Sequence, residues 1–170
     1  MKAAIYLLIV IAFLNPKIVL AQQTPALSPD KNVWMALTIG PALSGFEPGI
    51  TARATAEYAS TTSIYALEYM AYSNLNFIPS NNFREFSAIG VMYGHIKRYD
   101  FFKLTYSAGL SLVIPGGDTG GRYTFGLPLS AQFILTPLRL VAAGVRAYAC
   151  YIPGNSVVGI GLAFYLGKVH

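Results

Sequence analysis

The sequence predicts an all-β fold, an eight-stranded antiparallel up-and-down transmembrane β-barrel that follows an N-terminal signal peptide. Three observations predict it: apolar and small polar residues alternate, the alternating segments are long, and short connections alternate with longer ones. Alternation with a period of two is typical of a strand with two different faces. In the segment 103–114, for example, Leu104 and Leu112 share one face and Ser107 lies on the other.

The composition agrees with a membrane protein that has no spanning helix. Of the 170 residues 54% are hydrophobic and only 11% are charged, whereas about 25% is usual for soluble domains. No run of about 18 uncharged apolar residues marks a transmembrane helix. The single cysteine, Cys150, excludes an internal disulfide. We expect it to be a small buried residue.

The N-terminus has the pattern of a secretory signal peptide. Lys2 precedes the apolar run 3–14, and Val19-Leu-Ala21 supplies a site for cleavage after Ala21. We therefore expect a signal peptide at 1–21 and a barrel domain at 22–170; an uncleaved membrane anchor is the alternative. Loss of Lys2 and Lys17 would lower the formal net charge from +5 to +3. No basic cluster indicates nucleic-acid binding.

Eight alternating segments follow in order. Each has about 11 to 15 residues, which suits strands that cross a membrane at about 9–11 residues better than soluble strands of about 5–6. The segments are 33–43, 49–59, 62–73, 85–97, 100–114, 123–135, 139–152 and 157–168.

The connections between these segments alternate in length. Longer ones at 44–48, 74–84, 115–122 and 153–156 are separated by short ones at 60–61, 98–99 and 136–138. Bacterial outer-membrane barrels have short periplasmic turns and longer outer loops. An even number of strands then places both termini in the periplasm.

The apolar faces are predicted to contact lipid. The opposite faces carry mainly Gly, Ser and Thr, and have few of the Lys and Glu residues that keep solvent-facing sheets soluble. Aromatic residues on the apolar face, several near strand ends, match an aromatic girdle. They are Tyr58, Tyr65, Tyr69, Tyr93 and Phe102.

Five charged residues within the segments share the small polar face and are predicted to meet inside the barrel. They are Arg53, Glu57, Glu68, Lys103 and Arg146. A two-residue turn at Ser60-Thr61 would pair Arg53 with Glu68, and on the other face Ala54 with Leu67, Ala52 with Tyr69 and Ala56 with Tyr65. The interior charges form either a structural plug or a site that handles protons or a ligand, and the plug is favoured because an arginine keeps a neighbouring carboxylate ionised.

No catalytic, metal or cofactor site is predicted. The two histidines are His170 at the end of the chain and His95, which parity places on the lipid side beside Tyr93. No nucleophile–histidine or metal-ligand motif is present. Asp118 lies in the glycine-rich stretch 115–121, interpreted as a surface loop rather than a Ca²⁺ or phosphate site.

The expected partners are membrane lipid and lipopolysaccharide. Arg84 and Arg122 fall in longer connections and could bind lipopolysaccharide phosphates through charge-assisted hydrogen bonds; solvated loop cations are the alternative. An extracellular protein or other surface ligand could also bind the loops. We expect a monomer.

Short motifs carry a family resemblance. They are Gly126-Leu-Pro-Leu-Ser-Ala-Gln132, Gly154-Asn155 and the closing Gly159-x-Gly-Leu-Ala-Phe-Tyr-Leu-Gly-Lys168. In these the chain resembles small outer-membrane β-barrel proteins of Bacteroidota-type bacteria, which implies an eight-stranded barrel of generally undefined function. By architecture it also resembles barrels that act in adhesion or envelope integrity. Many outer-membrane barrels end in an aromatic residue, whereas this chain ends Gly167-Lys-Val-His170.

These observations lead to one expectation and two alternatives. We expect a non-enzymatic barrel in the outer membrane of a Gram-negative bacterium, exported by the general secretory pathway, with a structural or surface-interaction role. The first alternative is a soluble exported barrel that binds a hydrophobic ligand, like a lipocalin, and requires the apolar faces to point inward. The second is a lipid-modifying outer-membrane enzyme. A porin is not expected, because eight strands leave no open pore.

Overall fold

Eight long strands form the described part of the chain. The computed structural model describes residues 32–45, 47–74, 85–116, 122–136 and 140–168; the expected signal peptide lies outside these ranges. The strands are β1 (Asn32–Ser44), β2 (Glu47–Ala59), β3 (Ser63–Asn74), β4 (Phe86–Arg98), β5 (Phe102–Pro115), β6 (Thr124–Leu135), β7 (Val141–Tyr151) and β8 (Val157–Gly167). Each boundary lies within two residues of the segment expected from the sequence.

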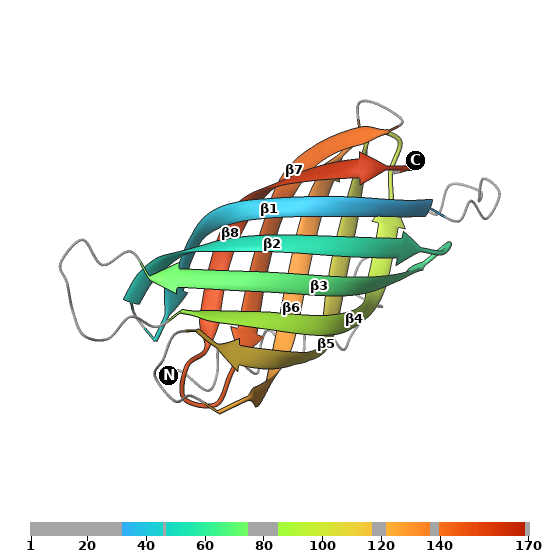
Figure 1. Cartoon of the computed structure of the whole chain (residues 1–170). Helices are drawn as coiled ribbons and strands as arrows, with labels where there is room; N and C mark the ends of the chain where they lie inside the picture. The colour runs from blue at the N-terminus through green and yellow to red at the C-terminus, as the bar shows by residue number, and fades with distance from the viewer. Residues whose placement is uncertain (1–31, 46, 75–84, 117–121, 137–139, 169–170) are drawn as a thin grey trace, which may run out of the picture.

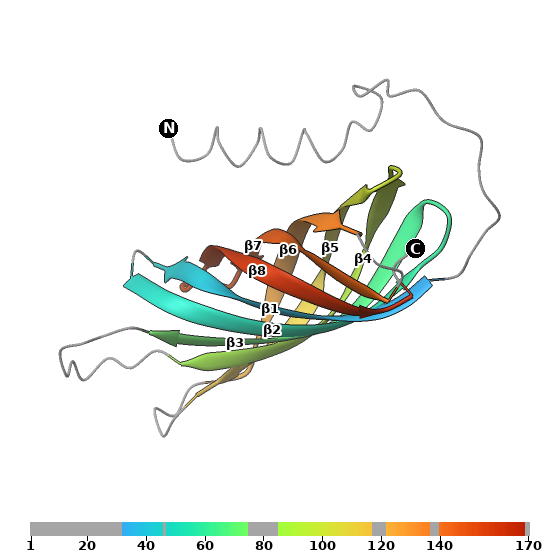
Figure 2. The same cartoon turned by 90° about the horizontal axis from the view of Figure 1, so that it is seen from above.

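The strands close into a single barrel. Each strand pairs antiparallel with the next one in sequence, and β8 pairs antiparallel with β1. Figure 1 shows β1, β2 and β3 side by side across the front, and Figure 2 shows the same strands from above. The predicted eight-stranded antiparallel up-and-down barrel is therefore confirmed. Among the described residues, no helix is long and apolar enough to cross a membrane.

The two ends of the barrel differ in their connections. At one end, here called the turn end, lie the connections 60–62, 99–101 and 136–140, together with the start of β1 and the finish of β8. At the other, the loop end, lie the connections 45–46, 75–85, 116–123 and 152–156. The expected loop at 44–48 is wrong, because Glu47 and Pro48 belong to β2 and Gly45 turns the chain with a φ of 56°.

Where the ladder between strands is interrupted, a proline lies in the gap. The pairing of β1 with β8 passes over Gly40 and Pro41, and that of β5 with β6 passes over Leu127 and Pro128. Proline has no N–H group to donate to a neighbouring strand. The register is the same on both sides of each gap, so the inward and outward faces are kept along the whole strand.

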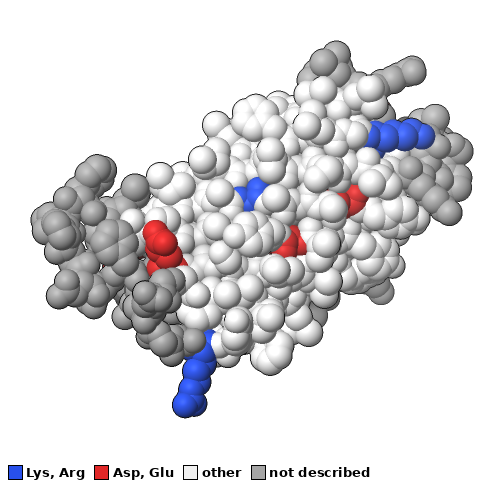
Figure 3. All heavy atoms as spheres, in the orientation of Figure 1, with Lys and Arg blue, Asp and Glu red and all other residues white. Residues whose placement is uncertain are grey.

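Apolar side chains cover the outside of the barrel. Exposed and buried positions alternate along the strands, as in β2 and β8. The exposed positions are largely apolar, including Leu37 (60% exposed), Val91 (62%) and Leu162 (61%). On the face drawn in Figure 3, charged side chains project mainly at the two ends, and only small patches of charge show between them. The faces predicted to point outward do so.

Two apolar clusters fill the inside, one at each end. The turn-end cluster is Trp34, Ala36, Ala59, Ile64, Ile96, Ile134, Ala142, Ala163 and Tyr165. The loop-end cluster is Ala42, Met70, Tyr72, Phe86, Ala88, Val113, Tyr148, Cys150, Ile152 and Val157. The interior is thus less polar than the alternation of small polar residues suggested.

Candidate functional site: the charges inside the barrel

Inward positions of three strands bring together the interior charge cluster, defined as Arg53, Glu57, Glu68 and Arg146. Arg53 and Glu57 lie on β2, Glu68 on β3 and Arg146 on β7. Because side chains alternate across a strand, residues at even spacing on β2 point to the same side. All four are buried, and at most 4% of any one is exposed.

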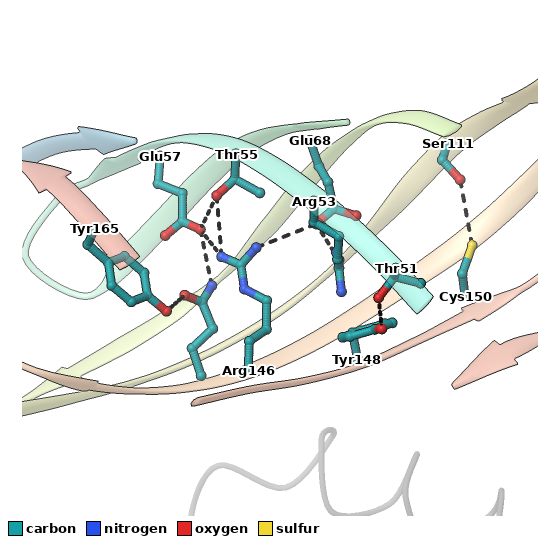
Figure 4. Close-up of polar contacts among 11 residues, drawn as sticks. Thr51, Arg53, Thr55, Glu57, Glu68, Ser111, Arg146, Tyr148, Cys150 and Tyr165 are labelled. Carbon is teal, nitrogen blue, oxygen red and sulfur yellow. Dashed lines mark hydrogen bonds and ion pairs between the residues drawn. The ribbon is translucent and has the colours of Figure 1, made fainter. Parts of the chain in front are cut away.

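The arginines and glutamates of this cluster form ion pairs. Arg53 Nη2 pairs with Glu68 Oε2, and Arg146 Nη2 pairs with Glu57 Oε1. Arg146 Nη1 also lies 3.9 Å from Glu68 Oε2. Arg146 therefore joins the two carboxylates, as Figure 4 shows. Each charge of this cluster has an opposite charge beside it, which offsets part of the several kcal/mol that each ion loses on leaving water.

Glu57 has the most hydrogen-bond partners in the cluster. Its Oε2 accepts from the indole Nε1 of Trp34 at 2.8 Å. Its Oε1 accepts from Thr55 Oγ1 at 2.9 Å and from Gln132 Nε2 at 3.2 Å, as well as from Arg146. The phenol of Tyr165 donates to the other end of the Gln132 amide, Oε1, at 2.8 Å. A carboxylate held by this many donors is fixed in position and has little capacity left for another ligand.

Arg53 also contacts an aromatic ring. Its guanidinium carbon lies 4.3 Å from the centre of the Tyr148 ring, within the range of a cation–π interaction. The Tyr148 hydroxyl is hydrogen-bonded to Thr51 Oγ1. Through Arg53, the charge cluster therefore contacts the loop-end cluster, to which Tyr148 belongs.

The register predicted for β2 and β3 is wrong by two residues. Arg53 lies opposite Met70, and Glu68 lies opposite Thr55, so the Arg53–Glu68 pair is diagonal. The turn is at Thr61-Thr62, with Ser60 N donating to Ser63 O at 2.9 Å. The run 60–63 contains only Ser and Thr, so no glycine, asparagine or proline marks the turn residues.

A shift of two residues leaves every side chain on its predicted face. It changes the neighbours on the outer surface. Ala54 faces Tyr69, Ala56 faces Leu67 and Tyr58 faces Tyr65, instead of the predicted partners.

Lys103 stays outside the ion pairs. It lies inside the barrel near the start of β5 and is only 2% exposed. Its Nζ has no hydrogen-bond partner in the part of the chain that the structure describes, and it lies 5.8 Å from the centre of the Trp34 ring. The structure thus brings four of the five predicted interior charges into contact and places the fifth beside an aromatic ring.

Four interior aromatic residues were not predicted from the sequence. Trp34, Tyr72, Phe86 and Tyr148 are at most 6% exposed. Their positions along the strands could have indicated this. Tyr148 lies two residues from Arg146 and Tyr72 lies four residues from Glu68, so each is on the same face of its strand as an inward charge.

The remaining candidates lie elsewhere. Arg122 is exposed just before β6, at the loop end, whereas Arg84, Asp118 and His170 lie outside the described residues. His95 is exposed on the outer surface, with its ring centre 5.8 Å from that of Tyr93. Cys150 is buried, as predicted. Within the described ranges, no group of three or more His, Cys, Asp or Glu residues could hold a metal ion.

Comparisons with known proteins identify the fold. No protein-family model and no curated protein matches the chain. Among solved structures it is similar to Neisserial surface protein A, with a TM-score of 0.65 and 17% identity over 80% of this chain and 96% of that one. It is also similar to Ail, the attachment invasion locus protein of Yersinia pestis, with a TM-score of 0.58 and 10% identity over 82% and 99%. Both are small eight-stranded outer-membrane β-barrels, and at these identities the likeness establishes the fold.

Proposed function

We propose that the protein is an integral, non-enzymatic β-barrel of the outer membrane of a Gram-negative bacterium. The observation that carries this proposal is the apolar outer surface, on which the large aliphatic and aromatic side chains of all eight strands are exposed. Soluble monomers rarely expose a contiguous apolar patch of more than a few hundred Å². A bilayer is the solvent in which such a surface is stable.

A band of aromatic side chains near the turn end supports this location. Tyr58 and Tyr65 have ring centres 6.2 Å apart, and Tyr65 and Tyr93 are 5.3 Å apart. The band continues through His95 to Tyr106, whose ring centre is 5.5 Å from that of His95. Aromatic girdles of this kind mark the membrane–water interfaces of outer-membrane barrels.

The interior supports a structural role rather than transport. The interior charge cluster lies between the turn-end and loop-end clusters, and its charged groups bind one another. We propose that this packed interior is a plug that lets the barrel close without a water channel, since eight strands leave room for little more than side chains.

The loop end is where a surface ligand would bind. We propose lipopolysaccharide or an extracellular partner there, with Arg122, and Arg84 from the part of the chain not described, as candidate contacts. Side-chain hydrogen bonds at the strand ends form a fixed base for the loops. Asn74 Nδ2 donates to Glu47 Oε2 at 2.9 Å, and Ser44 Oγ donates to Asn155 Oδ1 at 2.6 Å.

Narrower features of the proposal rest on sequence patterns. They are the signal peptide at 1–21, export by the general secretory pathway, the Bacteroidota-type family and the monomeric state. Phe164 and Tyr165, near the end of β8, are the aromatic residues available to serve as an insertion signal.

The two alternatives have less support. A soluble, lipocalin-like barrel needs its large apolar residues inside, yet Leu37, Leu162 and Phe164 are about 60% exposed. A lipid-modifying enzyme needs a general base beside a nucleophile. His95 instead lies on the outer surface among Tyr93 and Tyr106, near the turn end.

The proposal is tested by refolding and fractionation. We expect the protein to fold only in detergent or lipid, to migrate faster before boiling than after boiling on a denaturing gel, and to fractionate with the outer membrane of the native host. A stable, folded monomer in buffer without detergent would contradict the proposal and favour the ligand-binding barrel.

A further inference from the structure

Lys103 is a buried cation for which the described residues supply no acceptor. Within those ranges its Nζ makes no hydrogen bond. Each ion pair in the described residues uses Arg53 or Arg146 as its cation. A buried charge without a partner costs several kcal/mol, so an acceptor beside the ammonium group would stabilise the fold, and the described residues supply none.

The charge balance of the interior leads to the same conclusion. The buried charged residues described by the structure are three cations, Arg53, Lys103 and Arg146, and two carboxylates, Glu57 and Glu68. Both carboxylates are paired with arginine. One positive charge therefore remains, and it is on Lys103.

Trp34 contacts both Lys103 and the charge cluster. Its ring centre is 5.8 Å from Lys103 Nζ, and its indole N–H donates to Glu57 Oε2 at 2.8 Å. The carboxylate is thus held by the edge of the indole while the lysine lies over the ring. Lys103 itself takes no part in the arginine–glutamate ion pairs of the described residues.

Two further buried residues near the turn end have polar side-chain atoms without a hydrogen-bond partner among the described residues. One is Thr105, two residues after Lys103 on β5, whose Oγ1 finds no partner in the described part of the chain. The other is Asn32, two residues before Trp34 on β1, which is fully buried and whose two side-chain polar atoms bond to none of the described residues. Arg98 lies opposite Lys103 in the β4–β5 register, which adds positive charge at the turn end.

We propose that Lys103 and Thr105 form a binding site for a small inorganic anion, of which chloride is the type, next to the indole ring of Trp34. The anion completes the charge balance of the interior and accepts charge-assisted hydrogen bonds from the lysine. The neighbouring side chains of the turn-end cluster, such as Ala59 and Ile134, are fully buried, which favours a monatomic ion over a larger anion.

The chain carries its own probe for this site. Trp34 is the only tryptophan, and it is 1% exposed. Bromide and iodide quench indole fluorescence on contact, whereas chloride does so only weakly. We therefore expect saturable quenching of the detergent-folded protein by sodium iodide at constant ionic strength held with sodium gluconate. Chloride should reverse the quenching, and neutral acrylamide should leave the buried indole largely unquenched.

Two variants and a control locate the site. Lys103→Met should abolish the saturable quenching, and Thr105→Val should raise the half-saturating iodide concentration several-fold. Lys97→Met is the matched control, because it removes the same charge from β4 at the same end but from an outward position, opposite Leu104. Iodide should quench the fluorescence of this control variant with the same saturation as in the unaltered protein.

Three outcomes would overturn the proposal. They are no quenching by iodide in the unaltered protein, quenching that rises linearly without saturation, and saturable quenching that Lys103→Met leaves unchanged. If Lys103→Met does not fold, chloride competition in the unaltered protein and the Thr105→Val titration decide the question. The site would be contradicted if chloride did not reverse the quenching, or if Thr105→Val left the half-saturating iodide concentration unchanged.

Discussion

At the scale of single residues, the interior depends on Arg146 and Glu57. Arg146 contacts both carboxylates of the charge cluster, and Glu57 accepts hydrogen bonds from residues of four strands, β1, β2, β6 and β7. Removal of one partner leaves the other buried and unpaired, which costs more than the pair itself contributes.

We predict that Arg146→Met lowers the free energy of unfolding by about 3–5 kcal/mol, the range for breaking a buried ion pair. The expected measurement is urea unfolding in lipid vesicles, followed by Trp34 fluorescence. Arg122→Met, which removes an exposed arginine at the loop end, is the control and should change stability by less than about 0.5 kcal/mol.

The double variant Glu57→Gln/Arg146→Met separates the energy of the ion pair from the energy of side-chain packing. It should recover part of the loss, because a neutral amide replaces the unpaired carboxylate. If the double variant loses as much as the two single variants added together, the residues are not coupled and the ion pair is not the reason for the loss.

At the scale of elements, each strand is defined by the difference between its two faces. β8 places Leu162 outward at mid-strand, between Ile39 of β1 and Val145 of β7, while Ala163 and Tyr165 point inward. In a membrane strand, a charged substitution has a different effect on the outward face than on the inward face, because lipid contacts one face and protein the other.

We predict that Leu162→Arg destabilises the folded barrel by about 2–4 kcal/mol, the cost of an arginine facing lipid at mid-depth. The same unfolding experiment in vesicles measures it. Leu162→Ala is the control, because it removes the leucine without adding a charge and should cost clearly less. An arginine at this position that is neutral or stabilising would show that the outer face contacts water.

At the scale of the whole molecule, the interior is layered. The charge cluster lies between the apolar turn-end and loop-end clusters, and aromatic residues such as Trp34 and Tyr148 join the layers through hydrogen bonds and ring contacts. The anion proposed at Lys103 would lie within the turn-end layer and would not open a path through the barrel.

We predict that the refolded protein gives no stable ion-conductance steps in a planar lipid bilayer, because the proposed plug would leave no continuous water path. A conventional porin incorporated in the same bilayer is the positive control. Regular, voltage-independent steps from the purified protein would contradict the structural plug.

The sequence alone determined most of the architecture. Alternation along stretches such as Lys103–Ile114 predicted the strands to within two residues and placed each inward charge on the correct face. These features are local, since the direction of a strand side chain depends on its position in that strand and not on the partner strand.

The tertiary structure alone decided which inward residues meet. The run of Ser and Thr at 60–63 does not specify its own turn, so the β2–β3 register comes from the packing of the two strands in the barrel. Similarly, Lys103 and Arg146 carry the same charge on equivalent faces, yet one contacts Trp34 and the other the glutamates. Contacts across the lumen depend on how far each strand is staggered when the sheet closes, and that stagger is a property of all eight strands together.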